Sequence, residues 1–327
     1  MDRRRSSPED LPPLQLHELR RLDLAEAPAK GHPAHVSSAS GVARRGDHVY
    51  VIGDDLLSLA VFRLSQPGAG ELRPVLEGEP AAEGEDPQKH KPDLEALTVL
   101  PPFPGNPYGA LLGLGSGSAP GRDRGFTWGL AADGALRGDP RTVDLAPLYG
   151  LLADRVPELN IEGACVMGDR LWLLHRGNHE DTTNVIAELA LDEVMASLRG
   201  DLTIDVDELD VLRSYDLGAL EGVPLAFSDA TPLGRDLLVF TASAEAQGGD
   251  GPDGAIRGSV VGTIDLGGDV QRLRTIDRRW KVEGVHATID TGVMDFLFVC
   301  DQDAPEEASP LLSAAMPVDG HFEHDDG

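Results

Sequence analysis

The sequence predicts an all-β fold, a single five-bladed β-propeller. Three observations lead to this prediction: a strand-opening motif that recurs five times, an apolar run of strand length after each motif, and the composition. Glycine (38) and proline (24) are abundant and aromatic residues make up only 5%, which favours many short elements joined by turns. A chain of 327 residues could form one repeat fold or two ordinary domains. The internal repeat favours a single repeat fold over two domains.

The repeat consists of five segments that each open with Ser or Glu. In four of them a Gly or Pro follows six positions later, as expected for the turn that ends a short strand. Consecutive openings are 55 to 67 residues apart, which suits four-stranded blades with rather long loops. We therefore predict that the blades start near residues 40, 95, 162, 228 and 283.

Each opening is predicted to be the innermost strand of a blade, followed by a buried second strand. The second strands are expected within residues 48–55, 108–118, 170–178, 236–245 and 294–303. The fifth unit runs out of chain before a fourth strand, so residues 16–24 are predicted to supply it and close the ring. The predicted organisation is a flexible segment (1–13), the propeller (14–318) with a short helix at 191–200, and an acidic tail (319–327).

The strong negative charge limits the classes of partner. A formal net charge of −28 repels nucleic acid and anionic membranes, so neither is expected as a partner. Solubility or a salty habitat explains the acidity better than an acidic docking surface does. The N-terminus has no apolar segment typical of a secretion signal, and no apolar run could span a membrane, which predicts a cytoplasmic protein. A monomer is assumed, and Cys165 and Cys300, both in apolar segments, are predicted to be buried thiols.

The five opening residues should meet at the centre of the molecule, because the innermost strands of a propeller line its axis. We call them the ring residues: Ser40, Glu95, Glu162, Ser228 and Glu283. Three carboxylates without a counter-charge would repel one another, and would either take up protons or bind a cation. Oxygen ligands in a wide ring favour a hard cation, Ca²⁺ over Mg²⁺. The alternative is a set of polar strand ends in a water-filled channel.

A Glu-Gly dipeptide outside the five openings tests the register. Glu221-Gly222 lies thirteen residues before its turn at Gly234, whereas Ser228 lies six before it. We therefore assign Ser228 to the ring and predict that Glu221 lies in a loop.

The order Ser, Glu, Glu, Ser, Glu at these five strand openings resembles the central calcium site of the soluble calcium-activated nucleotidases, or apyrases, which are five-bladed propellers. The resemblance implies that the five ring residues are calcium ligands. The DLEAL (93–97) and NIEGA (160–164) segments are also similar to segments of bacterial esterase-like phytases and of SdiA-regulated propellers. The nucleotidases are secretory or membrane-anchored, and their nucleotide-contacting residues are not matched here. The resemblance therefore supports the metal more than the activity.

Further candidates lie in segments that should open on the same face as the ring. Three of the four lysines of the chain lie within six residues of a ring Glu. Such cations could hold a phosphate or carboxylate, or could merely offset nearby acids. The candidate ligand-binding residues are Lys89, Lys91, Asp93, Asn160, Asn178, Arg279 and Lys281. The loops after the second strands should add acidic and hydroxyl groups, among them Asp54, Ser116, Ser118, Ser243, Glu245 and Asp301.

Two functions follow from these residues. The first is a calcium-dependent hydrolase of a small phosphorylated or otherwise anionic compound, with His175 as acid or base and Arg176 as an anion contact. The second is a non-enzymatic propeller with a structural calcium and a face that binds a ligand or protein. The sequence has no Gly-x-Ser-x-Gly elbow, His-Glu-x-x-His motif or paired Cys motif, which argues against those serine hydrolases and common zinc enzymes.

Overall fold

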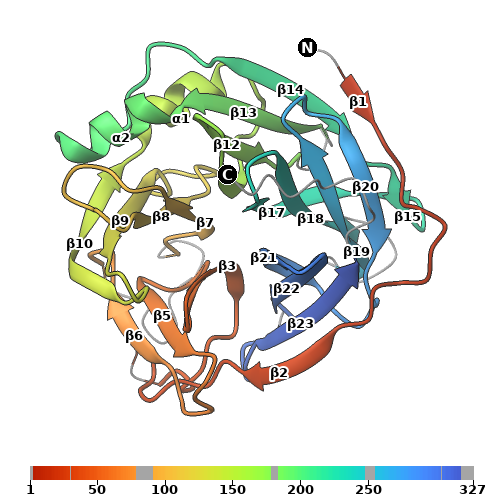
Figure 1. Ribbon diagram of the computed structural model, residues 1–327, viewed down its shortest axis with the longest axis horizontal. Coiled ribbons are helices and arrows are strands. Elements are labelled where there is room, and N and C mark those ends of the chain that lie inside the picture. Colours follow the sequence, from red (N-terminus) through yellow and green to blue (C-terminus); the bar gives the residue numbers. More distant parts are fainter. Residues whose placement is uncertain are drawn as a thin grey trace.

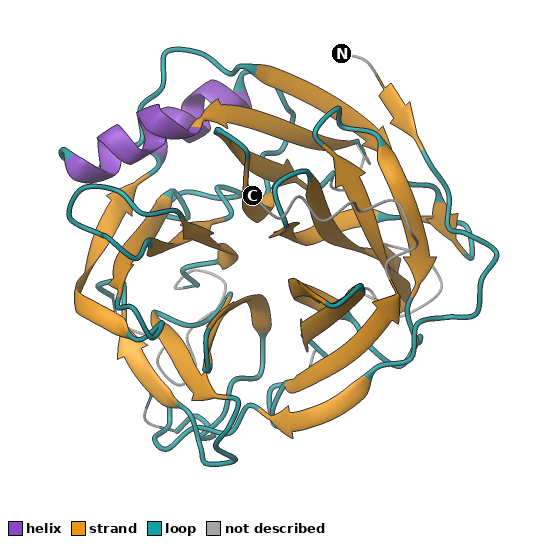
Figure 2. Cartoon of the chain, viewed as in Figure 1, coloured by secondary structure: helices purple, strands orange, loops and turns teal. Residues whose placement is uncertain are grey.

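The protein is a five-bladed β-propeller, as predicted. The structure, a computed structural model, describes residues 3–29, 31–78, 91–177, 183–246, 255–302 and 304–317. Figure 1 shows five antiparallel sheets arranged around a central axis, and Figure 2 shows how little helix accompanies them. No helix in these ranges is both long and apolar enough to cross a membrane.

Each blade contributes four antiparallel strands, numbered here from the axis outward. Blade 1 consists of β3 (Ala39–Arg45), β4 (His48–Gly53), β5 (Ser58–Arg63) and β6 (Glu71–Pro74). Blade 2 consists of β7 (Leu94–Leu100), β8 (Ala110–Gly115), β9 (Arg124–Leu130) and β10 (Leu136–Asp144). Blade 3 consists of β11 (Ile161–Met167), β12 (Arg170–His175), β13 (Asn184–Ala190) and β14 (Val211–Asp216). Blade 4 consists of β17 (Ala226–Leu233), β18 (Leu237–Ala246), β19 (Ala255–Asp265) and β20 (Val270–Thr275).

The fifth blade is closed by the N-terminal part of the chain, which confirms the prediction for residues 16–24. Its strands are β21 (Val282–Asp290), β22 (Val293–Cys300), β23 (Pro310–Pro317) and β2 (His17–Arg21). Strand β2 pairs antiparallel with β23, although about 290 positions separate them in the sequence. The closure joins the first and last blades and covers an edge that would otherwise be open.

The segment before β2 is not the flexible arm that the sequence predicted. Strand β1 (Arg3–Arg5) pairs in parallel with the outer strand of blade 3, and Arg4 forms an ion pair with Asp269 of blade 4. Farther along, the Leu14 N–H donates to the carbonyl of Thr275 in blade 4. Leu24 then bridges to Gly70 in blade 1. Figure 1 shows residues 3–24 following the rim of the propeller from blade 3 past blade 4 to blade 5.

Within the described residues, two helices and a small hairpin interrupt the blades. Helix α2 (Leu191–Arg199) lies between β13 and β14, as predicted. Helix α1 (Ala146–Ala153) was not predicted, because its short, mostly apolar sequence lacks an amphipathic pattern and contains Gly150. Strands β15 (Ala219–Leu220) and β16 (Val223–Pro224) form a hairpin with Glu221 and Gly222 at its turn. Glu221 therefore lies in a turn outside the ring register, as expected.

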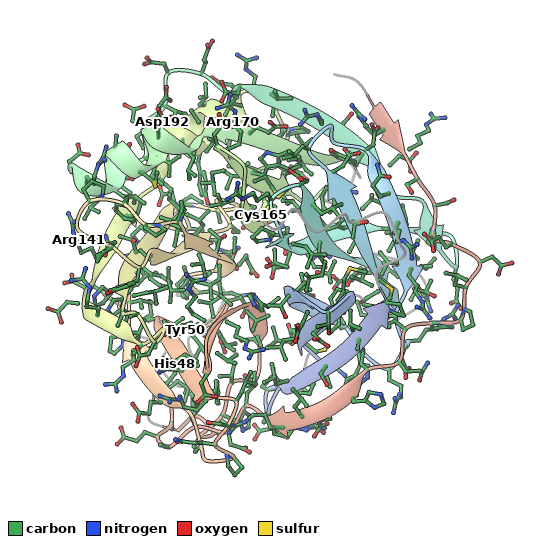
Figure 3. All side chains as sticks on the ribbon, viewed as in Figure 1. His48, Tyr50, Arg141, Cys165, Arg170 and Asp192 are labelled. Carbon is green, nitrogen blue, oxygen red and sulfur yellow. The ribbon has the colours of Figure 1, made fainter. Side chains whose placement is uncertain are left out.

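The apolar core consists of five clusters, one at each junction between neighbouring blades. The cluster between blades 2 and 3 also includes apolar side chains of both helices. The other four combine side chains from the facing surfaces of blades 4 and 5, 3 and 4, 5 and 1, and 1 and 2. Cys165, labelled in Figure 3, and Cys300 are buried free thiols, as predicted. Burial of apolar surface between neighbouring blades therefore stabilises the whole propeller.

The glycine that follows two of the ring glutamates allows neighbouring inner strands to approach closely. A Cβ on Gly163 would lie 2.9 Å from the backbone nitrogen of Ala230 in blade 4. A Cβ on Gly284 would lie 3.0 Å from the Cα of Gly41 and from the carbonyl oxygen of Ser40 in blade 1. The Glu-Gly dipeptide of the repeat thus places a carboxylate at the axis and, next to it, the small residue that the packing of blades requires.

We expect Gly163→Ala to lower the free energy of unfolding by about 1–3 kcal/mol, because backbone atoms of the next blade have to move. The control is Gly150→Ala in α1, where an added Cβ meets nothing within 4 Å. That change should be neutral or stabilising, since Ala favours a helix. Denaturant unfolding measures both, and equal effects of the two changes would contradict the close-approach explanation.

Candidate functional site at the propeller axis

Every ring residue is the extra residue of a β-bulge. In each blade, the residues on either side of it pair with consecutive residues of the second strand, and the ring residue itself is skipped. In blade 3, for example, Ile161 pairs with His175 and Gly163 pairs with Leu174, so Glu162 has no partner. A bulge bends its strand and redirects a side chain. The fivefold bulge is the structural basis of the repeat seen in the sequence.

The neighbouring blade holds the residue before the ring residue at three of the five junctions. The N–H of Phe227 donates to Asn184 Oδ1 at 2.9 Å, and the N–H of Val282 donates to Ser259 Oγ at 3.2 Å. The N–H of Ala39 donates to Ser309 Oγ at 3.3 Å. Asn184 begins the third strand of its blade, Ser309 directly precedes it and Ser259 lies within it, and each is buried. The bulges are therefore fixed from the adjacent blade as well as from within their own.

The three ring glutamates influence one another electrostatically, as expected if they converge. Burial raises the pKa of Glu95 well above its usual value, and the neighbouring Glu162 raises it further. Burial also raises the pKa of Glu162 to about 7, against the effect of Arg176, with Glu283 adding to the rise. Carboxylates that are both desolvated and close to one another favour protonation or a bound cation.

Two of these carboxylates have a counter-charge, which for Lys281 is one of the two alternatives that the sequence left open. Arg176 NH1 lies 3.7 Å from Glu162 Oε1, and Lys281 Nζ lies 3.5 Å from Glu283 Oε1. Both cations also face Glu245 of blade 4, with Arg176 NH2 at 2.7 Å and Lys281 Nζ at 4.0 Å. Negative and positive side chains thus alternate across blades 3, 4 and 5, in the order Glu162, Arg176, Glu245, Lys281 and Glu283.

The side of the axis formed by blades 1 and 2 is arranged differently. Lys91 pairs with Asp54 and lies 3.5 Å from Asp93. Burial alone would lower the pKa of Lys91, but Asp54 raises it above its usual value. Asp93 is buried, accepts hydrogen bonds from the Ser116 and Ser118 hydroxyls, and pairs with Arg122 at 3.0 Å. Glu95, half-buried, has no hydrogen bond or ion pair to any residue that the structure describes.

The two ring serines use their hydroxyls within their own blades. Ser40 Oγ donates to the carbonyl of Ser38, and Ser228 Oγ donates to Ser243 Oγ, both at 3.4 Å. As the side chains lie, no group of three or more His, Cys, Asp or Glu residues in the described ranges is arranged to hold a metal ion. The donor set suits a hard cation chemically, but Arg176 and Lys281 occupy two of its three carboxylates.

The remaining predicted residues have the following positions. His175 is buried, and its Nδ1 accepts a hydrogen bond from the N–H of Asn160 at 3.1 Å. Asn160 also donates to Glu162 Oε1 at 2.6 Å. Arg279 is exposed and pairs with Asp277 at 2.7 Å, so it lies apart from the axial contacts. Lys89 and Asn178 lie outside the described residues.

Sequence reasoning missed several polar residues that complete the site. Glu245 and Asp301 were placed correctly on this face, and Asp301 lies 3.9 Å from Lys281. Arg122 was missed because no spacing linked it to Asp93. Asp229 was also missed, although it breaks the repeat by following a ring residue where the other blades have Gly or Ala. That departure was visible in the sequence.

A cavity of about 760 Å³ lies elsewhere, between the outer strands of blades 1 and 2. Its arginines, Arg63 and Arg73, already pair with Asp47 and Glu71. The His48 ring, which lines this cavity, stacks on that of Tyr50 with centroids 6.1 Å apart (Figure 3). We place the candidate site at the axis, where buried charges converge, and not in this groove.

The chain belongs to a protein family without an assigned activity. The Family of unknown function (DUF6929) matches residues 35–316, which span all five blades. No curated protein matches the sequence. The resemblance to calcium-activated nucleotidases therefore stays a prediction.

Solved structures of several enzymes resemble the chain at low identity. Glutaminyl cyclase of Myxococcus xanthus has 12% identity and a TM-score of 0.44, and the match covers 94% of this chain and all of that one. A luciferin-regenerating enzyme has 9% identity and a TM-score of 0.43, with 87% and 93% covered. An engineered GH43 glycoside hydrolase has 12% identity and a TM-score of 0.48, with 96% and 58% covered.

The raised pKa of Glu162 gives a pH dependence of known sign. Between the usual value of 4.5 and about 7, the folded state binds more protons than the unfolded state. In chelator-treated protein, the free energy of unfolding should therefore fall by about 1–3 kcal/mol as the pH rises through this range. Glu162→Gln should flatten the profile. A profile that rises over this range, or one that Glu162→Gln leaves unchanged, would contradict the assignment.

Proposed function

We propose that the axial site binds a divalent cation, calcium, together with a small phosphorylated or otherwise anionic compound, and that the protein hydrolyses this compound. The ring glutamates would hold the cation, with Ser40 and Ser228 able to add oxygen ligands. The cations Lys91, Arg176 and Lys281 would hold the anion. The location of the protein in the cytoplasm stays a prediction.

One observation carries the proposal: acidic groups outnumber basic groups around the axis. The axial contacts described above join six carboxylates to four cations, and a seventh carboxylate, that of Glu95, has no direct partner among the residues that the structure describes. Such an excess of buried negative charge is unfavourable unless protons or a cation neutralise it. An anionic compound alone would add to the excess. It could bind only with a cation beside it.

Hydrolysis at this site would depend on the bound cation and on three side chains of the chain. Calcium, when bound, would orient the anionic group and increase the acidity of a water molecule. Arg176 and Lys281 could stabilise charge that develops on the leaving group. His175 could act only through Nε2, because its Nδ1 accepts the Asn160 N–H.

The non-enzymatic alternative uses the same site. Calcium would then join the inner strands of several blades, and the polar face around the axis would bind a ligand or a protein without turnover. Propellers serve both roles, so the fold does not decide between them.

Calcium should raise the melting temperature of the protein at neutral pH, and magnesium should do so less. At a hundredfold excess over the dissociation constant, one site contributes about 2.7 kcal/mol to the free energy of unfolding. Glu95→Gln and Glu162→Gln should each abolish the shift. Glu221→Gln is the matched control, since it changes the same Glu-Gly dipeptide outside the ring.

Differential scanning calorimetry measures these shifts in melting temperature. Three outcomes are informative. A shift that Glu221→Gln removes as well would contradict the axial site. No shift, together with no metal in elemental analysis, would refute calcium binding. A shift in a protein that turns over no phosphate ester, nucleotide or carboxylic ester would leave the non-enzymatic alternative.

Lys281→Met should weaken the binding of inorganic phosphate in the presence of calcium by about tenfold, since it removes a charged contact at the site. Arg279→Gln is the control, because Arg279 lies two positions away but is exposed and paired with Asp277. Isothermal titration calorimetry measures both. Equal losses would indicate a general charge effect and would argue against Lys281 as a direct contact.

A further inference from the structure

Blade 4 breaks the internal repeat at two positions that face each other. In the other four blades, the residue after the ring residue is Gly or Ala, and its partner on the second strand is Ile, Leu or Val. In blade 4 the same pair is Asp229 and Thr241. Both side chains are fully buried. A small and an aliphatic residue thus suffice for packing elsewhere, and blade 4 replaces them with polar groups.

Both polar groups bind the backbone of the inner strand of blade 5. Asp229 Oδ2 accepts a hydrogen bond from the Val285 N–H at 2.8 Å. Thr241 Oγ1 donates to the carbonyl of Glu283 at 3.4 Å. Asp229 Oδ1 accepts from the Ala230 N–H at 2.7 Å, so both carboxylate oxygens have donors.

Two buried serines of blade 4 extend this contact along the same backbone. Ser243 Oγ donates to the carbonyl of Val282 at 3.1 Å. Ser259 Oγ donates to the carbonyl of Trp280 at 3.3 Å and accepts from the Val282 N–H at 3.2 Å. Four side chains of blade 4 therefore form hydrogen bonds with the backbone of residues 280–285. At the junctions that follow blades 3 and 5, the described contacts with the equivalent backbone use one side chain each, Asn184 and Ser309.

The segment held in this way carries two charged residues of the axial site. Lys281 and Glu283 pair with each other, and Lys281 also faces Glu245 and Asp301. A lysine side chain loses much conformational freedom when it is fixed, so a backbone fixed in advance reduces the cost of placing its charge. Burial of Asp229 is itself costly, and Gly or Ala at this position avoids that cost in the other blades.

We propose that Asp229, Thr241 and Ser259 are positioning residues that fix Lys281 and Glu283 at the axial site for the anionic part of the ligand. This inference rests on the proposed function above, because it names the residues that hold part of that site in place.

The test compares Ser259→Ala with Thr98→Val in the full chain. Thr98 is a buried residue of an inner strand whose hydroxyl has no hydrogen-bond partner among the described residues. Ser259→Ala should speed amide hydrogen exchange in residues 280–285 at least tenfold and should weaken calcium-dependent phosphate binding five- to tenfold. Thr98→Val should change neither. Thr241→Val, nearly isosteric, is the second variant if Ser259→Ala does not fold.

The outcomes separate this inference from the proposed function. Unchanged exchange in residues 280–285 would overturn the positioning role outright. Faster exchange with unchanged phosphate affinity, measured where the variant is folded, would show a purely structural role and would also overturn it. Wild-type protein that binds neither calcium nor phosphate would refute the proposed function, whatever the exchange shows, and the positioning role in binding would fall with it.

Discussion

The close approach of five inner strands at the axis is the constraint on which the rest of the structure depends. It requires a small residue after most ring residues, as the contacts at Gly163 and Gly284 show. Every inner strand also has a bulge at its ring residue, which is left out of the pairing with the second strand. The five omitted residues carry the polar groups of the axis. In blades 3 and 5, a single Glu-Gly dipeptide therefore serves both the packing and the site.

The electrostatics of the axis follow from this geometry. Bulged carboxylates from blades 2, 3 and 5 come together in a desolvated place, which raises the pKa values of Glu95 and Glu162. Part of the cost is offset by Arg176 and Lys281, and Asp229 and its neighbours in blade 4 fix the backbone beside Lys281. On the side of blades 1 and 2, Glu95 has no direct partner among the described residues. The site is therefore asymmetric, because in the part of the chain that the structure describes Glu162 and Glu283 lie beside cations and Glu95 does not.

The sequence predicted the parts of this structure that repeat. The spacing between ring residue and turn was sufficient to choose Ser228 over Glu221, and the missing fourth strand of the last unit was sufficient to assign residues 16–24. The axial counter-charges beside Glu162 and Glu283 were foreseen only as nearby cations, since no pattern shows that Arg176 and Lys281 share Glu245.

Several features that do not repeat from blade to blade were not predicted. Strand β1 depends on contacts such as that between Arg4 and Asp269, 265 positions apart, which no local pattern records. Arg122 and Asp93 are likewise joined only by the fold. By contrast, Asp229 and Thr241 stand where the register of the repeat predicts a small residue and an aliphatic one. Aligning the blades by that register would have drawn attention to both.

The most direct test of the account is a crystal structure of the protein with calcium, with anomalous diffraction collected at a long wavelength. The account predicts an anomalous peak on the axis, 2.3–2.6 Å from oxygens of Glu95, Glu162 and Glu283. At least one of the contacts of Arg176 and Lys281 with these carboxylates should be broken. An axis without a peak, with both ion pairs intact, would contradict it.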